Sequence, residues 1–213
     1  IASRNIDVIG IDINQDIVDG LNCGNTHFHE PDLDKLVAST VSSGKLRASS
    51  KAEPSDIFVI TVPTPINHDK TCDASYVFSA VELIAPVLEP SNLVILESTS
   101  PVGLTEKCVD LLSSLRKDLK FPTYQDNSII EDVHVAYSPE RVLPGKILSE
   151  LVKNNRVIGG ITDLSAQKAL EFYSIFVEGE CIKTNSRTAE LCKLTENSFR
   201  DVNIAFANEL SLI

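Results

Sequence analysis

The sequence lacks the features of a membrane or secreted protein. Its 213 residues contain no run of about 18 uncharged apolar residues, the length that a membrane-spanning helix needs. No basic segment followed by an apolar stretch opens the chain, as a secretory signal would. We therefore predict a cytoplasmic protein with no membrane partner.

Basic charge is also scarce. Lys and Arg number 19 against 30 Asp and Glu, so the formal net charge is -11 at pH 7, and the acidic residues are spread along the chain. Nucleic acids bind basic surfaces that neutralise their phosphates, so no nucleic-acid partner is expected. The 43% of hydrophobic residues provides enough apolar content for one sizeable core.

Disulfide and metal patterns are missing as well. The cysteines are odd in number, widely spaced and without a CxxC pair, which argues against a disulfide framework or a zinc knuckle. They are Cys23, Cys72, Cys108, Cys181 and Cys192. His27 and His29, two residues apart beside Glu30, have no third ligand, so we predict no metal site.

Methionine is absent altogether, and the chain opens at Ile1 without an initiator. At the other end, residues 207–213 stop inside a helical pattern with no glycine or asparagine cap beyond it. We expect both ends to be cut, so that the chain is part of a longer protein.

What the sequence does contain is a regular alternation of strands and helices. Apolar runs of strand length cover 6–11, 56–62, 92–97, 134–137 and 156–160. Helical patterns cover 14–20, 31–42, 73–88, 104–116 and 164–176. This alternation predicts an α/β fold, a doubly wound parallel sheet with right-handed crossovers, in which ligands bind at the carboxyl ends of the strands. The pattern from Arg187 to Ile213 is too long for the alternation and predicts a connecting helix that leaves the domain.

Two kinds of strand end carry candidate cofactor contacts. Asp12 follows the opening strand, where a carboxylate can accept hydrogen bonds from both ribose hydroxyls of an adenosine and so favour NAD over NADP. A plain turn or helix-start acid is the alternative. The turns TVPTP at 61–65 and ESTSPVG at 97–103 offer hydroxyls and amides for phosphate, ribose or a water, although Ser, Thr and Pro are also ordinary turn residues.

Two further segments carry candidate catalytic groups. In the loop YSPERVLPG at 137–145, Glu140 can act as a general base and Arg141 can pair with phosphate, unless the two form an ordinary surface ion pair. In the helix after Ala189, Glu190, Lys193 and Asn197 share one face. An ammonium and an amide side by side can hold a developing oxyanion, whereas a solvated helix face is the alternative.

Taken in this order, these motifs resemble the UDP-glucose/GDP-mannose dehydrogenase family over essentially the whole chain. The resemblance implies a Rossmann-like NAD-binding domain at 1–185, with its first strand and glycine-rich loop missing, and the start of a central connecting and dimerisation helix at 186–213. The family uses NAD to oxidise the C6 alcohol of a nucleotide sugar to a carboxylate in two steps. The details at 97–103, 139–145 and 185–190 look most like the enzymes that act on UDP-N-acetyl-D-mannosamine, which supply surface polysaccharides in bacteria.

The resemblance also implies roles for single residues. Asp12, Val62 and Thr64 would contact NAD, and Thr99 would lie near the nicotinamide and help to position a water. Glu140 would assist hydrolysis of a thioester, while Lys193 and Asn197 would stabilise oxyanions. Glu140, Lys193 and Asn197 would also contact the substrate, together with Arg141.

The departures from the family pattern concern both ends and one loop position. The GxGYxG loop should precede Ile1, and the cysteine nucleophile should follow Ile213. Pro144 stands where the UDP-glucose enzymes carry a carboxylate, which favours another substrate. Alternatives are UDP-N-acetylglucosamine, UDP-glucose or GDP-mannose, or a catalytically silent NAD-binding and dimerisation module. The family forms homodimers, so a second copy is an expected partner.

Overall fold

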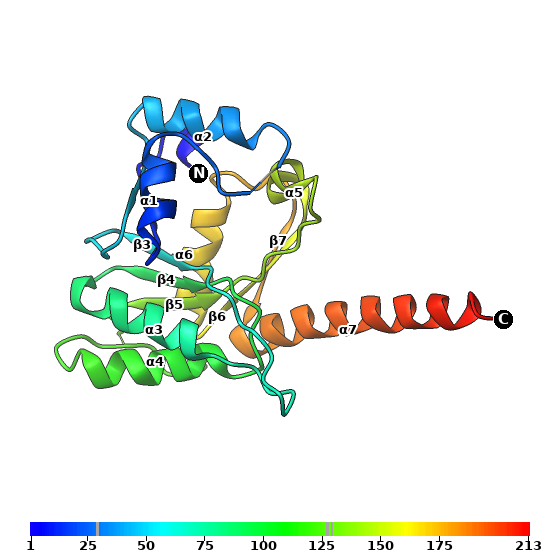
Figure 1. Cartoon of the computed structure of the whole chain (residues 1–213). Coiled ribbons are helices and arrows are strands. Elements are labelled where there is room, and N and C mark those ends of the chain that lie inside the picture. The colour runs from blue at the N-terminus through cyan, green and yellow to red at the C-terminus, as the bar shows by residue number, and fades with distance from the viewer. Residues whose placement is uncertain (29, 127, 129) are drawn as a thin grey trace.

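A five-stranded sheet forms the centre of the molecule in the computed structural model, which describes residues 1–28, 30–126, 128 and 130–213. The strands run side by side in the order β3, β4, β5, β6, β7 (Figure 1). They are β3 (Ile57–Ile60), β4 (Leu93–Leu96), β5 (His134–Tyr137), β6 (Arg156–Gly160) and β7 (Cys181–Asn185). All four residues of β4 and all four of β5 are buried, as expected for strands covered on both faces.

A second, two-stranded sheet is formed by β1 (Val8–Ile11) and β2 (Leu46–Ser49), which pair in parallel. Among the described residues, no strand joins this pair to the five-stranded sheet. The pair is accompanied by α1 (Gln15–Asn22) and α2 (Leu33–Ser42). Asn14 caps α1 by accepting a hydrogen bond from the Asp16 backbone N–H, as the sequence predicts for this helix start.

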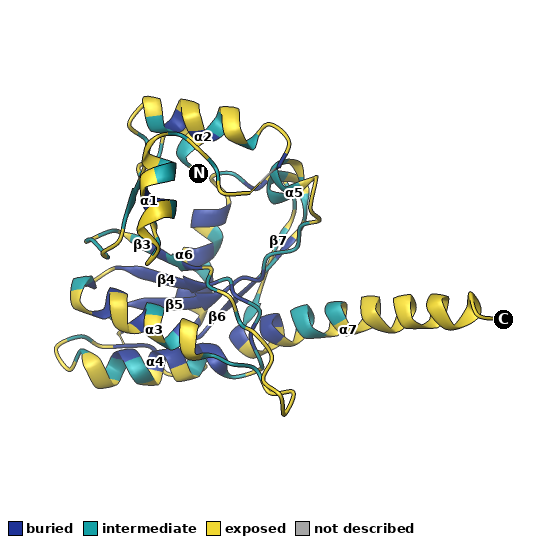
Figure 2. Ribbon diagram, viewed as in Figure 1, coloured by how far each residue is buried: buried dark blue, intermediate teal, exposed yellow. Residues whose placement is uncertain are grey.

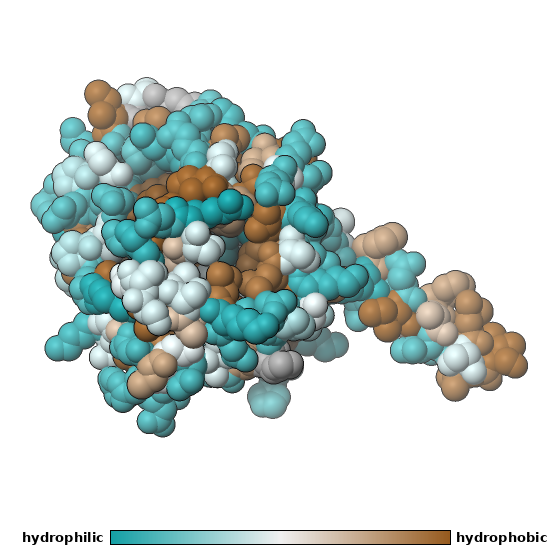
Figure 3. Space-filling view, turned by 90° about the horizontal axis from the view of Figure 1, so that it is seen from above, coloured by the Kyte–Doolittle hydropathy of each residue, from teal (hydrophilic) through white to brown (hydrophobic). Residues whose placement is uncertain are grey.

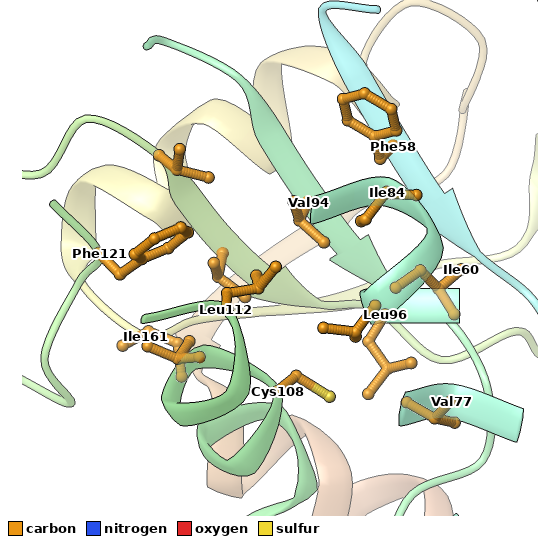
Figure 4. Close-up of a cluster of buried hydrophobic side chains, with 14 of the residues drawn as sticks. Phe58, Ile60, Val77, Ile84, Val94, Leu96, Cys108, Leu112, Phe121 and Ile161 are labelled. Atoms are coloured by element: carbon orange, nitrogen blue, oxygen red, sulfur yellow. The ribbon is translucent and has the colours of Figure 1, made fainter. Parts of the chain in front are cut away.

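Helices cover both faces of the five-stranded sheet, which confirms the predicted α/β, Rossmann-like class. One face carries α3 (Ser75–Ile84) and α4 (Leu104–Leu115), and the other carries α6 (Asp163–Tyr173). Alternate residues of β4 serve the two sides, because successive side chains of a strand point to opposite faces. Val94 and Leu96 pack in the larger cluster with α3 and α4 (Figure 4), whereas Leu93 and Ile95 pack with α6.

The sheet is parallel except at one position. β5 and β6 pair antiparallel, with Tyr137 opposite Gly159, while every other pairing in both sheets is parallel. A sequence alternation of strands and helices does not reveal this reversal. Because of it, the amino end of β6 lies at the same edge as the carboxyl ends of β4 and β5.

The chain also forms elements that the sequence pattern did not predict. They are the strands β2 and β7, the helix α5 (Ile147–Lys153), and the short 3-10 helices η1 (Ala2–Arg4) and η2 (Ala85–Val87). Each strand among them has only four or five residues and no fully buried residue, so its apolar signal is weak.

A single long helix, α7 (Ser186–Leu210), leaves the body of the molecule. Its first turns are partly buried and its later turns are exposed (Figure 2). The sequence predicted a long helix here. In the part of the chain that the structure describes, no helix, α7 included, is long and apolar enough to cross a membrane.

Candidate functional site

The turns after β3 and β4 are joined at the carboxyl edge of the sheet. The Ser98 hydroxyl donates to the Val62 carbonyl oxygen at 2.7 Å, and the Ser100 hydroxyl donates to the Ser98 carbonyl at 2.8 Å. Thr64 and Thr99 are half-buried in these turns. The predicted cofactor-contacting residues Val62, Thr64 and Thr99 therefore lie on two neighbouring turns that hydrogen bonds hold together.

Asp12 follows β1, as predicted, and its side chain is half-buried. Its Oδ1 accepts a hydrogen bond from the Asn14 backbone N–H at 2.8 Å, an Asx-type turn contact. The carboxylate thus serves the turn that leads into α1 and keeps further acceptor capacity.

Glu140 lies in the loop after β5, and three different groups contact it. Its Oε2 accepts from the Arg156 guanidinium at 2.9 Å, and its Oε1 accepts from the Arg141 backbone N–H. The ammonium of Lys193 on α7 donates to its carbonyl oxygen. Glu140 is therefore fixed at both its carboxylate and its backbone.

Lys193 is half-buried, and this burial lowers the pKa of its ammonium group. The nearby carboxylates of Glu140 and Glu196 raise the pKa again, without cancelling the effect of burial. Glu196 also forms an ion pair with Arg141, so α7 contacts the Glu140 loop through two side chains.

The other predicted residues are less closely joined. Asn197 is half-buried, and its Oδ1 accepts from Arg200 at 3.2 Å. Among the described residues, no hydrogen bond links Asp12, Thr64, Thr99 or Asn197 to the group formed by Glu140 and Lys193. The structure brings together Glu140, Arg141 and Lys193, while Val62, Thr64 and Thr99 lie on the two joined turns and Asp12 and Asn197 lie apart from both groups.

Glu190 shares the α7 face with Lys193 but has a different role. It is fully buried, and its carboxylate accepts from the Gly103 backbone N–H at 2.6 Å and the Thr105 backbone N–H at 2.9 Å. These are the orphan donors at the start of α4. An anion is therefore already present at this helix end, which argues against a phosphate site there.

Sequence reasoning missed a buried ion cluster beside Glu140. Arg156, the first residue of β6, lies between Glu140 and Glu97, and Tyr173 donates its hydroxyl hydrogen to Glu97 Oε1 at 2.6 Å. Burial raises the pKa of Glu97, although Arg156 opposes this shift. Burial also raises the pKa of Tyr173 well above its usual value, and Glu97 adds to that effect. The one sequence signal that could have pointed to this cluster is Arg156 itself, a charged residue at the first position of an apolar strand.

No group of three or more potential metal ligands occurs among the described residues. His29, one of the two histidines considered above, lies outside them. Glu30 is buried and accepts hydrogen bonds from the backbone N–H groups of Gly145 and Ile147, both at 2.9 Å. Its carboxylate thus caps the start of α5.

Comparison with protein families gives two consecutive matches. The NAD binding domain model of the UDP-glucose/GDP-mannose dehydrogenase family matches residues 1–177, and the central domain model of the same family matches residues 187–213.

Individual relatives agree with these matches. A UDP-N-acetyl-D-mannosamine dehydrogenase of Escherichia coli K12 is 58% identical over 212 residues, and an NDP-N-acetyl-D-galactosaminuronic acid dehydrogenase of Ralstonia nicotianae is 56% identical over 213 residues. Each alignment covers 100% of this chain and 50% of the relative, so the chain spans about half the length of the curated relatives it matches. The solved UDP-D-ManNAc dehydrogenase of Pyrococcus horikoshii superposes with a TM-score of 0.91 at 41% identity, covering 99% of this chain and 49% of that chain.

Proposed function

Because the chain belongs to the UDP-glucose/GDP-mannose dehydrogenase family, we propose that it is the cofactor-binding half of an NAD-dependent nucleotide-sugar 6-dehydrogenase. The proposed reaction oxidises the C6 alcohol of UDP-N-acetyl-D-mannosamine to the uronate in two hydride-transfer steps, for synthesis of a surface polysaccharide. The observation that carries the proposal is the contact of Lys193 on α7 with the Glu140 backbone carbonyl, which places an ammonium beside the loop that carries the Glu140 carboxylate.

The proposed roles follow from the chemistry of these groups. The Lys193 ammonium and the Asn197 amide stabilise negative charge that develops on the sugar oxygen. Glu140 accepts a proton from the water that hydrolyses a thioester, formed on the cysteine that the family resemblance assigns to a following domain. Arg141 contacts the substrate, and its ion pair with Glu196 holds its guanidinium beside α7.

The residues at the strand ends fit an adenine dinucleotide. Asp12 keeps acceptor capacity for ribose hydroxyls, and Val62, Thr64 and Thr99 lie on two turns that Ser98 holds together. NAD supplies the hydride acceptor of the reaction. Since Glu190 fills the start of α4, the pyrophosphate needs donors from elsewhere. Calorimetry on the 213-residue chain is expected to give weak NAD binding.

The choice of sugar rests on similarity and on one loop residue. Relatives named for N-acetylmannosamine and for N-acetylgalactosaminuronic acid are 58% and 56% identical, so identity alone does not separate the two substrates. Pro144 in place of a carboxylate disfavours UDP-glucose.

A substrate panel tests this proposal with the complete protein encoded by the gene. NADH absorbance is followed with UDP-N-acetylmannosamine, UDP-N-acetylgalactosamine, UDP-N-acetylglucosamine, UDP-glucose and GDP-mannose. The highest kcat/KM is expected for UDP-N-acetylmannosamine, at two NADH per sugar. A preference for UDP-glucose, or one NADH per sugar, contradicts the proposed substrate or the proposed two-step reaction.

The second candidate is a catalytically silent NAD-binding and dimerisation module. It is favoured if the codons that follow Ile213 encode no cysteine in the next domain, and reading about 60 of them decides between the two.

Two further parts of the proposal concern assembly and location. We propose that residues 186–213 begin a central helix through which two copies associate, separate from the NAD-binding domain at 1–185. The exposed turns of α7 carry large apolar side chains, and hydrophobic residues are visible along the projecting helix in Figure 3. A shallow apolar groove on this helix is lined by Leu191, Leu194, Thr195, Ser198, Phe199 and Val202.

We also propose a cytoplasmic location. All five cysteines are free thiols, in keeping with a reducing cytoplasm.

A further inference from the structure

The Arg156 side chain is almost entirely buried between two carboxylates, with only 5% of it exposed. Its Nη1 lies 3.2 Å from Glu97 Oε1 at the end of β4, and its Nη2 lies 2.9 Å from Glu140 Oε2 in the loop after β5. The antiparallel direction of β6 makes this contact possible, because it brings the first residue of the strand to the edge where β4 and β5 end. One guanidinium therefore links two strand ends.

Aromatic side chains hold the guanidinium in place. Its carbon Cζ lies 4.7 Å from the centroid of the Tyr173 ring and 5.9 Å from that of Phe176, within the range of cation–π attraction. The Tyr173 hydroxyl also donates to Glu97 at 2.6 Å, which fixes the carboxylate on the far side. The planar, five-donor guanidinium suits such a bridge, whereas a lysine ammonium is a single point of charge.

Charges near Glu140 come from several elements. Arg156 faces it from β6 and Lys193 from α7, while Arg141 follows it in the loop and donates its backbone N–H to Oε1. Glu97 lies on the other side of Arg156. Burial alone would lower the pKa of Arg156, but the carboxylates of Glu97 and Glu140 reverse this and raise it, so the guanidinium stays charged.

We propose that Arg156 is a positioning residue that holds the Glu140 carboxylate in a fixed orientation for the hydrolytic step. This inference rests on the function proposed above. In that step a water oxygen bonds to the thioester carbonyl carbon, the C–S bond breaks, and the sulfur leaves as the thiolate. The water proton passes to Glu140. Arg156 accepts no proton and touches no reacting atom; it keeps one Glu140 oxygen occupied so that the carboxylate cannot turn away.

The test uses Arg156→Met in the complete protein, with Arg47→Met as the control because Arg47, on β2, forms an exposed ion pair with Glu53. Arg156→Met is expected to lower steady-state kcat about 10²-fold or more, the size of a general-base contribution. The two NADH of the first turnover still form rapidly, and intact-mass spectrometry detects an accumulated thioester. The acid limb of the kcat profile moves to higher pH, because Arg156 opposes the burial that raises the pKa of Glu97, and without the guanidinium this neighbouring carboxylate takes up a proton more readily.

Arg156→Lys, which restores the charge, is expected to move the acid limb back towards that of the wild type. If Arg156→Met does not fold, the double variant Arg156→Met, Glu97→Gln removes one positive and one negative charge together and is expected to accumulate the same thioester. An unchanged acid limb with no thioester, or an equal slowing of hydride transfer and hydrolysis, overturns the proposal. If the wild-type protein oxidises no nucleotide sugar, the proposed function itself is wrong, and that result is distinct from an active wild type with an unaffected variant.

Discussion

The fully buried carboxylate of Glu190 accepts hydrogen bonds from both the backbone N–H and the hydroxyl of Thr105, at 2.9 and 2.6 Å. Glu190 lies in the second turn of α7, and Thr105 lies in the first turn of α4. The contact therefore fixes the long helix against the helix that follows the 97–103 turn. Lys193 lies one turn further along α7, so this contact also determines where its ammonium reaches.

Replacing Glu190 by Gln is expected to lower the free energy of unfolding by about 1–3 kcal/mol, because the amide turns a hydrogen-bond donor towards buried donors. Urea unfolding followed by circular dichroism measures the loss. Glu209→Gln, an exposed position near the end of the same helix, is the control and should stay within about 0.5 kcal/mol of the wild type. Equal effects of the two substitutions would contradict the role given to Glu190.

Gly160 ends β6 where no side chain fits. A Cβ there would lie 2.2 Å from the Thr162 carbonyl oxygen and 2.3 Å from the Ala166 nitrogen, both of them backbone atoms. Gly160→Ala is expected to cost at least about 1–3 kcal/mol, because the start of α6 must move.

Gly20 offers the matched comparison. It lies inside α1, and a Cβ there would have no neighbour within 4 Å, so Gly20→Ala is expected to stabilise the protein by about 0.5–1 kcal/mol. Melting temperatures should shift in opposite directions for the two alanine variants. If both melting temperatures shifted in the same direction, the lack of space for a side chain at Gly160 would not be the cause of the effect of Gly160→Ala.

Local sequence signals predicted the elements with strong periodicity and missed what depends on pairing. The buried strands at 57–60, 93–96 and 134–137 were predicted because each is a short apolar run between turns. The direction of β6 was not predicted, since an apolar strand has the same composition whichever way it runs. That reversal is why Arg156 reaches Glu140, so the buried ion cluster could not be inferred from spacing. Glu140 and Lys193 were singled out because each lies within a motif that resembles the family, and their roles stay predictions.

The cysteines should differ sharply in reactivity. Burial raises the pKa of Cys108 to about 12, with a smaller contribution from the nearby Glu190 carboxylate, so almost no thiolate is present at pH 8. Cys23 is exposed. Iodoacetamide labelling followed by peptide mass spectrometry should therefore modify Cys23 at least about tenfold faster than Cys108 in the folded protein. Unfolding in urea should bring the two rates together, and early labelling of Cys108 would contradict the packing around α4.

The alkaline limb of activity should report on Lys193 in the complete protein. Burial lowers the pKa of this lysine below 10.5, and an oxyanion-binding ammonium must be protonated, so activity is lost as the pH rises through the lowered value. Glu196→Gln removes a carboxylate that raises this pKa and should move the limb to lower pH. Glu209→Gln, on the same helix, should leave it in place. If activity rose instead of falling at high pH, Lys193 would be excluded as the titrating group. An equal shift of the limb in Glu196→Gln and Glu209→Gln would exclude it as well.

Asp12 should set the choice of cofactor. Its carboxylate keeps acceptor capacity beside its bond to Asn14, and a negative charge there repels the 2′-phosphate that distinguishes NADP from NAD. Asp12→Asn keeps an acceptor for the Asn14 N–H, so the turn should survive while the charge is lost. In the complete protein we expect the ratio of kcat/KM for NAD over NADP to fall about tenfold, a change of about 1.4 kcal/mol. Asp16→Asn, in the first turn of α1, is the control, because its charge lies in the same segment but not at the strand end. An unchanged ratio in Asp12→Asn would remove this residue from the cofactor site and leave it as a turn residue only.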